Sequence, residues 1–108
     1  LIEGEVKGNK LYLADGTYLE DLVCEDQKVV VGLRPEFFVV NPEGNIEVKV
    51  DFVEHIGRDT MIIFTVEGSE KSIRAIVPSL KGIEAGQMIK LSYNKIFVFD
   101  KVNGGRIK

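Results

Sequence analysis

Short runs of alternating hydrophobic and polar residues follow one another along this chain of 108 residues. The clearest run covers residues 46–52, where Ile46, Val48, Val50 and Phe52 alternate with charged residues. A period of two places successive side chains on opposite faces of a β-strand, so one face is expected in the core and the other in water. Apolar residues nowhere recur at helical spacing for three turns. The pattern therefore predicts strands rather than helices.

Further strands are predicted wherever such a run is bounded by glycine, asparagine or proline, because these residues form turns or cannot pair within a sheet. Residues 60–66 are apolar on both faces, which is typical of a strand in the middle of a sheet. The polar stretch 20–27 has room for one helical turn. The predicted strands cover residues 2–6, 11–13, 17–19, 29–33, 46–52, 60–66, 72–77, 88–93 and 96–99.

About nine short strands separated by turns indicate an all-β fold, either a sandwich or a small barrel. We favour the barrel, because closure removes the exposed edges that short strands otherwise present. The expected fold is an OB-type small barrel formed by residues 28–108, with an additional N-terminal β-meander at residues 1–27 packed beside it. Together they are expected to form a single domain of residues 1–108, a length that one hydrophobic core can support.

Composition excludes several classes of protein. The chain is 44% hydrophobic and 29% charged, with a formal net charge of -3, so intrinsic disorder is not expected. No stretch approaches the roughly 18 apolar residues that a membrane-spanning helix needs. The chain begins with Leu1 rather than Met and shows no signal-peptide pattern. We therefore expect a cytosolic piece of a longer protein.

Few residues offer catalytic or metal-binding chemistry. The one histidine, His55, leaves a zinc site without its usual ligands, and the one cysteine, Cys24, has no disulfide partner. His55 shares the wetter face of its predicted strand with Asp51 and Val53 and is interpreted as a solvated histidine. Cys24 lies in an acidic stretch and is interpreted as a packing residue. The glycine-rich loop that cradles a phosphate is missing, and we expect no catalysis, metal or cofactor in this chain.

A nucleic-acid-binding role is the strongest alternative from the residues alone. OB barrels bind single strands with stacking aromatic residues and basic grooves. Binding a polyanion requires clustered cations, however, and the net charge here is negative. The aromatic residues are therefore interpreted first as core residues. The segment with the composition of such a surface contains Lys90, Tyr93, Lys95, Phe97, Phe99 and Lys101.

Four segments, taken in chain order, carry a resemblance to a known family. Residues 30–36 read V-V-G-L-R-P-E and are the most specific of them. Residues 53–60 read V-E-H-I-G-R-D-T, and residues 83–91 read I-E-A-G-Q-M-I-K-L. The last segment contains I-F-V-F-D at 96–100 and N-G-G-R-I at 103–107. This series resembles the C-terminal TOBE/OB regulatory region of ATP-binding subunits from bacterial ABC importers of the maltose and glycerol-3-phosphate group.

The resemblance implies a non-catalytic regulatory and dimerising domain from the ATP-hydrolysing subunit of an importer for sugars or related polyols. The nucleotide-binding domain, with its ATP and Mg, would lie outside this chain. The implied partners are a second copy of the subunit in a homodimer, the nucleotide-binding domain of the same chain, the membrane subunits of the importer and a regulatory protein. No nucleic acid is expected, and the implied location is cytoplasmic, at the inner face of the plasma membrane.

The same resemblance points to candidate regulatory or interface residues within the first two motifs. Arg34 and Glu36 either pair with neighbours or contact another domain or subunit, and Gly57 is expected in a turn with positive φ. Phe37 and Phe38, if both are exposed, enlarge an apolar patch of the kind that marks an interface. The full set of candidates is Gly32, Arg34, Pro35, Glu36, Phe37, Phe38, Gly57 and Thr60.

Two alternatives stay open beside regulation. One is an OB module that binds single-stranded nucleic acid. The other is the oxyanion-binding branch of TOBE domains, which holds a small anion at a subunit interface through an S-A-R-N run. That run is absent from this sequence, so oxyanion binding ranks below regulation.

Overall fold

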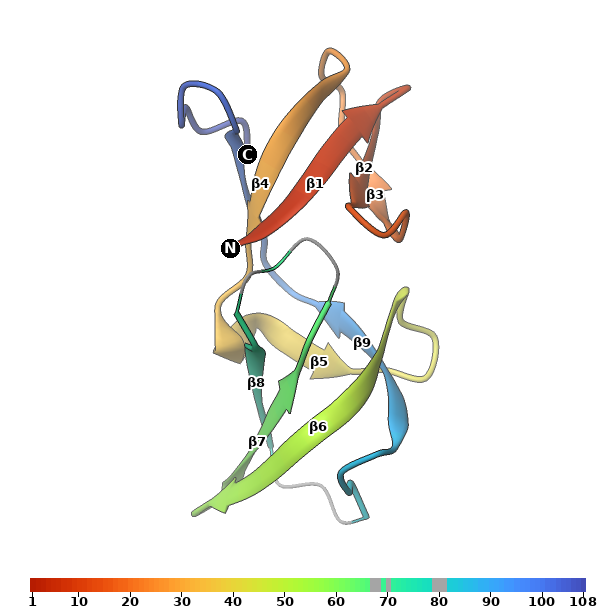
Figure 1. The fold of residues 1–108 in the computed structure, drawn as a ribbon, viewed down its shortest axis with the longest axis vertical. Coiled ribbons are helices and arrows are strands. Elements are labelled where there is room, and N and C mark those ends of the chain that lie inside the picture. The colour runs from red at the N-terminus through yellow and green to blue at the C-terminus, as the bar shows by residue number, and fades with distance from the viewer. Residues whose placement is uncertain (67–68, 70, 79–81) are drawn as a thin grey trace.

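The computed structural model describes residues 1–66, 69, 71–78 and 82–108 of the chain. Within these ranges it contains ten β-strands and one short 3₁₀ helix (Figure 1). No helix in the described part of the chain is long and apolar enough to span a membrane. The elements are β1 (Ile2–Lys7), β2 (Lys10–Leu13), β3 (Tyr18–Asp21), β4 (Gln27–Gly32), η1 (Pro35–Phe37), β5 (Phe38–Val40), β6 (Ile46–Ile56), β7 (Asp59–Phe64), β8 (Ile73–Pro78), β9 (Met88–Tyr93) and β10 (Phe97–Asp100).

The strands form two antiparallel sheets that lie end to end along the long axis of the molecule (Figure 1). The first sheet has the strand order β10-β4-β1-β2-β3, and the second has the order β5-β9-β6-β7-β8. We call the first sheet with its turns the N-terminal lobe, and η1 with β5 to β9 the barrel lobe. The principal extents of 42 × 23 × 22 Å reflect this elongated arrangement.

The second sheet curls into a small barrel. Its two outermost strands, β5 and β8, contact each other, and η1 packs against β8 at the same seam. Closure of this kind protects the edges of short strands. The all-β prediction with an OB-type small barrel is therefore confirmed. The barrel encloses the buried side chains of Phe38, Ile46, Val48, Val50, Ile62, Phe64, Ile73, Ala75, Val77 and Leu91.

The division of strands between the two units differs from the prediction. A boundary after residue 27 assigns β4 and β10 to the barrel, but both strands belong to the sheet of the N-terminal lobe. β4 pairs with β1 over a register that runs from Ile2 opposite Val31 to Val6 opposite Gln27. β10 then pairs with the other edge of β4. Periodicity identifies the strands of a sheet but not their partners, and this explains the difference.

Two elements at the start of the barrel lobe, η1 and β5, were also unexpected. β5 is only three residues long, too short to produce an alternating pattern. The helical turn allowed within residues 20–27 is not formed, since β3 ends at Asp21 and an irregular segment leads to β4. A 3₁₀ helix forms instead at η1, where Pro35 occupies the first position. Proline suits that position because its fixed φ is compatible with a helical turn and its missing N–H group is not needed there.

A β-bulge changes the register in the middle of β6. Val50 lies opposite Phe64, whereas Phe52 lies opposite Ile63, so two residues of β6 advance against one residue of β7. A bulge exchanges the faces that all later residues of the strand occupy. Phe52, predicted in the core beside Val50, is 53% exposed on the outward side. That prediction is wrong because it continued a strict period of two through the bulge.

Candidate functional site at the junction of the lobes

Most of the predicted candidate residues lie on the segment that leaves the N-terminal lobe and enters the barrel lobe (Figure 1). Gly32 ends β4, and Arg34 stands in an extended conformation (φ -71°, ψ 151°) immediately before η1. The residue before a proline is pushed toward extended backbone, so Pro35 accounts for both the end of the strand and the start of the turn. Glu36 is exposed within η1, and Phe38 begins β5.

A shallow groove of about 410 Å³ lies beside this segment. Its apolar part comes from Leu1 before β1, from Phe97 and Phe99 of β10, and from Leu33 between β4 and η1. Two exposed arginines contribute the charged part. The groove can therefore bind an apolar group and an anionic group side by side. Its lining residues are Leu1, Gly32, Leu33, Arg34, Phe97, Phe99 and Arg106.

Aromatic rings from the two lobes meet next to the groove. The ring centroids of Phe37 in η1 and Phe97 in β10 lie 6.0 Å apart. The Lys95 ammonium lies 5.1 Å from the centre of the Phe97 ring and 5.8 Å from that of Phe37. The Arg106 guanidinium lies 4.7 Å from the Phe97 ring. Lys95 thus contacts a ring of each lobe and helps to hold the lobes together, whereas the Arg106 contact lies within the N-terminal lobe.

A hydrogen-bond network ties the lobes on another side of the junction. The Tyr93 hydroxyl of β9 donates to the Glu20 carboxylate of β3 at 2.6 Å, and the Lys108 ammonium donates to the same carboxylate. Burial raises the pKa of the Tyr93 hydroxyl well above its ordinary value, and the Glu20 carboxylate raises it further. Tyr93 therefore stays protonated and keeps its role as a donor.

The two neighbouring phenylalanines behave differently. Phe38 is 3% exposed, and its ring packs edge-on against Phe64 at 5.6 Å between centroids. Phe37 is half-buried in the aromatic cluster. An exposed patch made of both rings is therefore not formed, because β5 points Phe38 into the barrel. Only Phe37 contributes to the surface of the junction.

The last two candidates lie away from the junction, in the hairpin between β6 and β7. Gly57 adopts φ 65° in the turn, as predicted for a glycine. Thr60 is fully buried, and its hydroxyl lies 3.2 Å from Nδ1 of His55. Because of the bulge in β6, Val53 faces the barrel interior and no longer shares the outward side with Asp51. The structure thus divides the predicted site between two places.

The aromatic and basic residues that were considered as a nucleic-acid-binding surface are also divided between the two lobes. The Tyr93 hydroxyl donates a hydrogen bond to Glu20, and Lys101 forms an ion pair with Glu3 at 2.7 Å. Lys90 lies in the barrel lobe, on a strand that pairs with β6, whereas Phe99 lies in the N-terminal sheet. The residues do not form one continuous surface.

Sequence reasoning missed Glu20 as a junction residue and treated it as part of a polar loop. Its partner Tyr93 is separated from it by 73 positions, so no local motif joins them. In the sequence, Arg106 and Phe97 were noted only as parts of the last family motif and of the aromatic segment. Their contact forms because the chain after β10 turns back along it, with Phe99 and Arg106 in a β-bridge.

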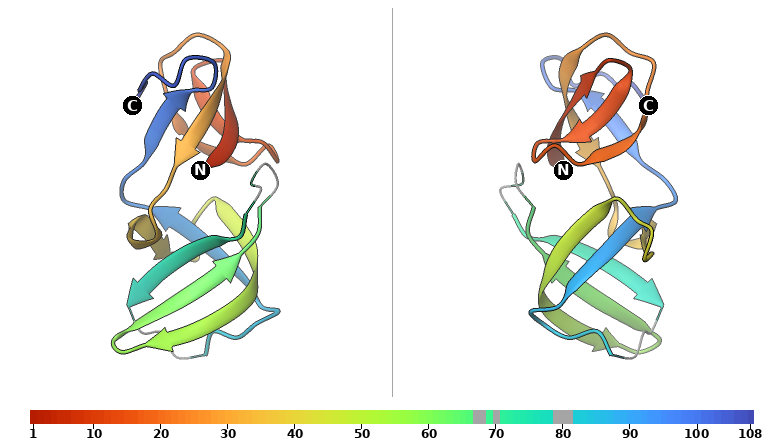
Figure 2. Two further views of the ribbon diagram at one scale, coloured as in Figure 1. Left: turned by 60° about the vertical axis from the view of Figure 1, so that its left-hand side comes forward. Right: turned by 90° about the vertical axis from the view of Figure 1, so that its right-hand side faces the viewer.

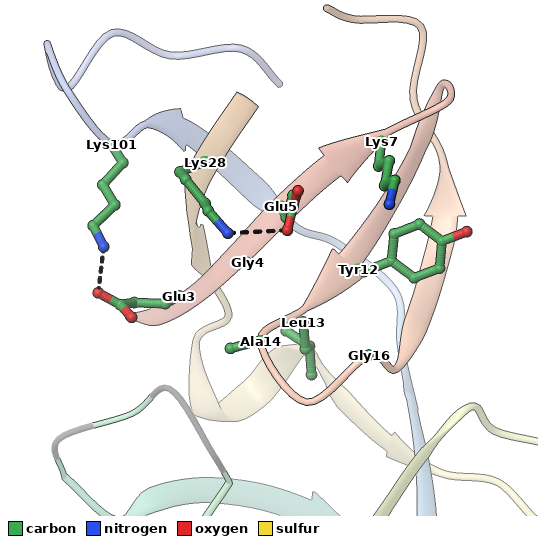
Figure 3. Close-up of a pocket in the computed structure, with 10 residues that line it drawn as sticks. All are labelled: Glu3, Gly4, Glu5, Lys7, Tyr12, Leu13, Ala14, Gly16, Lys28 and Lys101. Carbon is green, nitrogen blue, oxygen red and sulfur yellow. Dashed lines mark hydrogen bonds and ion pairs between the residues drawn. The ribbon is translucent and has the colours of Figure 1, made fainter. Parts of the chain in front are cut away.

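A second pocket, of about 640 Å³, lies on the outward side of the N-terminal sheet (Figure 3). Two ion pairs cross this side, from Lys101 to Glu3 at 2.7 Å and from Lys28 to Glu5 at 3.0 Å. The hydrogen bond from Lys101, together with its charge, lowers the pKa of the Glu3 carboxyl. None of the predicted candidate residues lines this pocket. It is an exposed, charged sheet surface rather than an enclosed binding site.

The remaining chemistry-bearing residues take structural positions. Cys24 is half-buried, and its Sγ accepts a hydrogen bond from Nε2 of Gln27 at 3.0 Å. Among the described residues, no three histidine, cysteine or acidic side chains are grouped to hold a metal ion.

The fold and the junction together define a small all-β domain of the OB type, with a second sheet attached to its barrel. The chain is 26% identical over 108 residues to the sn-glycerol-3-phosphate import ATP-binding protein UgpC of Ruegeria sp. (strain TM1040). It is 28% identical over 110 residues to the protein of the same name from Jannaschia sp. (strain CCS1). No family model matches the chain.

These alignments extend over almost the whole chain but over only part of each relative. They cover 98% and 99% of the chain, and 31% of the length of each relative. The chain thus spans less than a third of the curated relatives that it matches. The resemblance to ATP-binding subunits of sugar-type importers, first drawn from four short motifs, is confirmed by these relatives.

Proposed function

We propose that the chain is the regulatory and dimerising domain of the ATP-hydrolysing subunit of a bacterial importer for glycerol phosphate or related polyols and sugars. The observation that supports it most is the alignment of nearly the entire chain with 31% of two proteins named import ATP-binding proteins. In this proposal the domain itself is non-catalytic. ATP and Mg bind to a nucleotide-binding domain elsewhere in the same subunit, which lies at the cytoplasmic side of the membrane with the membrane subunits of the importer.

The physical role proposed for the domain is that of a tether. Two ATPase domains that separate after each hydrolysis would otherwise have to meet again by diffusion. A permanent contact between attached domains raises the effective concentration of one ATPase domain near the other, to the millimolar range for short connections. The paired lobes suit this role, because the Glu20–Tyr93 bond and the Phe37–Phe97 contact join them.

Regulatory input is proposed to enter at the junction groove. A protein or ligand bound there would change the activity of the subunit only if it prefers one arrangement of the two ATPase domains over the other. Arg34 and Phe37 lie on the connection between the lobes, so a partner that contacts them senses both lobes at once.

The experiment uses the full subunit and a version from which these 108 residues are removed. We expect the truncated subunit to hydrolyse ATP at high protein concentration but to lose activity steeply on dilution, because reclosure then requires a new encounter. The intact subunit is expected to keep its specific activity over the same dilution series. Equal dilution behaviour of the two proteins would contradict the tether. Loss of activity at every concentration would instead place these residues in the catalytic machinery.

A further inference from the structure

Gly32 lies in the junction groove, the depression of about 410 Å³ beside the segment that joins β4 to η1. It is paired with Phe97 of β10, and the side chain of Leu1 lies on its other side. In both views of Figure 2 the start of β1 lies beside the end of β4, at the end of the sheet that faces the barrel lobe. Because Gly32 has no side chain, the bottom of the groove between its two neighbours stays open.

The fold itself does not require a glycine at position 32. The residue ends a strand, and its φ lies outside the left-handed region that favours glycine. A Cβ at Gly32 would lie 3.5 Å from atoms of Phe97 and Phe99 and 3.6 Å from Leu1, which are ordinary contact distances. Glycine weakens a strand, and in such a position it often marks a place where another group approaches the backbone closely. We therefore interpret Gly32 as space for a bound group.

The charge of the groove is opposite to that of the whole chain. Two arginines, Arg34 and Arg106, line it, and no acidic side chain does, although the chain carries a formal net charge of -3. Within the part of the chain that the structure describes, neither arginine forms an ion pair. Guanidinium groups bind carboxylates through charge-assisted hydrogen bonds. The groove is therefore complementary to an anion that also has an apolar part.

Both arginines are attached to restrained parts of the structure. Arg106 forms a β-bridge with Phe99, and its guanidinium lies 4.7 Å from the centre of the Phe97 ring. This cation–π contact restricts the side chain before any ligand arrives. Arg34 stands in extended backbone immediately before Pro35, which limits its conformations. Less conformational freedom is lost on binding when the binding groups are already restrained.

The size of the groove favours a small molecule over a protein. A volume of about 410 Å³ falls within the range of roughly 300–1,000 Å³ that small-molecule sites occupy. Seven residues line it, whereas a stable protein–protein interface uses roughly 20–30 residues on each side.

We propose that the junction groove binds a small organic anion that consists of an apolar ring or short chain and one carboxylate. The apolar body lies over Gly32 against Phe97 and Phe99, and the guanidinium groups of Arg34 and Arg106 hold the carboxylate. Because Arg34 belongs to the connection between the lobes, the bound anion contacts that connection directly. Its action as the regulatory input of the subunit rests on the proposed function, whereas its binding does not.

The first test uses 3-phenylpropionate as a probe and the full subunit with its nucleotide site filled by a non-hydrolysable ATP analogue. Saturation-transfer NMR is expected to detect binding of the probe with a dissociation constant of about 1 mM, as its small size implies. The neutral 3-phenylpropanamide and inorganic phosphate are each expected to compete at least about threefold more weakly than unlabelled probe. The amide lacks the charge and phosphate lacks the apolar body. Absence of probe binding, or equal competition by either compound, would overturn the proposal.

The second test places the probe in the groove by substitution. Gly32→Ala, Arg34→Gln and Arg106→Gln are each expected to weaken binding of 3-phenylpropionate by about threefold or more, because the first fills the floor and the others remove a charge. Arg58→Gln is the matched control, since Arg58 is exposed in the hairpin between β6 and β7 and does not line the groove. Unchanged binding in Gly32→Ala, or in both groove arginine variants, would overturn the proposal. A wild-type denaturant midpoint in each variant shows that weaker binding does not come from unfolding.

These results separate the binding site from the function of the domain. If the probe does not bind and the truncated subunit still loses activity on dilution, the site is wrong and the tether remains. If the probe binds as expected and removal of the 108 residues leaves the dilution behaviour unchanged, the proposed function fails and the site remains.

Discussion

The two lobes share one way of building a core but treat their outward sides in opposite ways. In both lobes, alternate residues of each strand point inward and are buried, as Val29 and Val31 are in the N-terminal lobe and Ile62 and Phe64 are in the barrel lobe. The outward residues of the N-terminal sheet include paired acids and lysines, whereas those of β6, β7 and β8, such as Phe52, Met61 and Ile63, are mostly apolar.

The difference teaches that a stable sheet of this protein does not require the outward side of β6, β7 and β8 to be apolar. The N-terminal sheet forms five paired strands with charged outward residues, as expected for an antiparallel sheet with one face in water. An apolar outward side adds little to the folding of the monomer and exposes the protein to association. Exposed apolar side chains gathered on one side of a sheet are typical of interaction surfaces.

The largest expected effect comes from comparing a buried side chain on the inner side of the barrel with an exposed side chain on its outer side. Phe64→Ala removes a fully buried ring that packs against Phe38, and we expect a loss of about 3–5 kcal/mol in the free energy of unfolding. Phe52→Ala changes a side chain on the outward side of the same pair of strands. It is expected to lower the free energy of unfolding of the monomer by less than about 1 kcal/mol. Urea unfolding at low protein concentration measures both. Equal losses would contradict the assignment of Phe52 to the surface.

A pair of glycines tests the packing of the N-terminal lobe. A Cβ added at Gly4 would lie 2.6 Å from the carbonyl oxygen of Tyr12, so Gly4→Ala forces the backbone of β2 to move. We expect a loss of about 1–3 kcal/mol, as for other overpacked sites. At Gly32 the added Cβ would lie 3.5 Å from the side chains of Phe97 and Phe99, an ordinary contact distance. Gly32→Ala is therefore the matched control and is expected to unfold at nearly the wild-type denaturant midpoint.

The junction between the lobes is expected to show a smaller effect. Tyr93→Phe removes the hydroxyl that donates to Glu20 and keeps the ring. We expect a loss of about 1 kcal/mol, because the Glu20 carboxylate retains Lys108 as a partner. Thermal unfolding followed by circular dichroism measures the change. A wild-type midpoint in Tyr93→Phe would show that this bond does not stabilise the contact between the lobes.

The smallest effect is expected on the charged outward side of the N-terminal sheet. The pKa of the Glu3 carboxyl is lowered from its ordinary value of 4.5 by the bond to Lys101 and by its charge. The ion pair therefore stabilises the fold above the pKa of the unfolded chain, and this contribution is lost as the pH falls through the lowered pKa. The difference in stability between wild type and Glu3→Gln is expected to be small at neutral pH and to vanish in acid. A difference that grows in acid would reverse the assigned sign.

Local chemistry determined much of what the sequence could predict. The alternation at 46–52 located most of β6, and a glycine between two strand patterns located the turn at Gly57 with its positive φ. Pro35 marked the end of β4, because a proline restricts the residue before it as well as itself. Four short motifs were enough to indicate the kind of relatives that the chain has. Each of these features depends on residues within a few positions of one another.

Tertiary structure alone decided the partners. The pairing of β4 with β1 and of β10 with β4 moved two strands from the predicted barrel into the N-terminal sheet, and the bulge in β6 turned Phe52 outward. The tertiary structure also brought Glu20 and Tyr93, which lie 73 positions apart in the sequence, into a hydrogen bond. The physical reason is the range of the interactions. Backbone preference and side-chain period act over a few residues, whereas strand pairing, bulges and buried contacts follow from how distant segments fill one another's space.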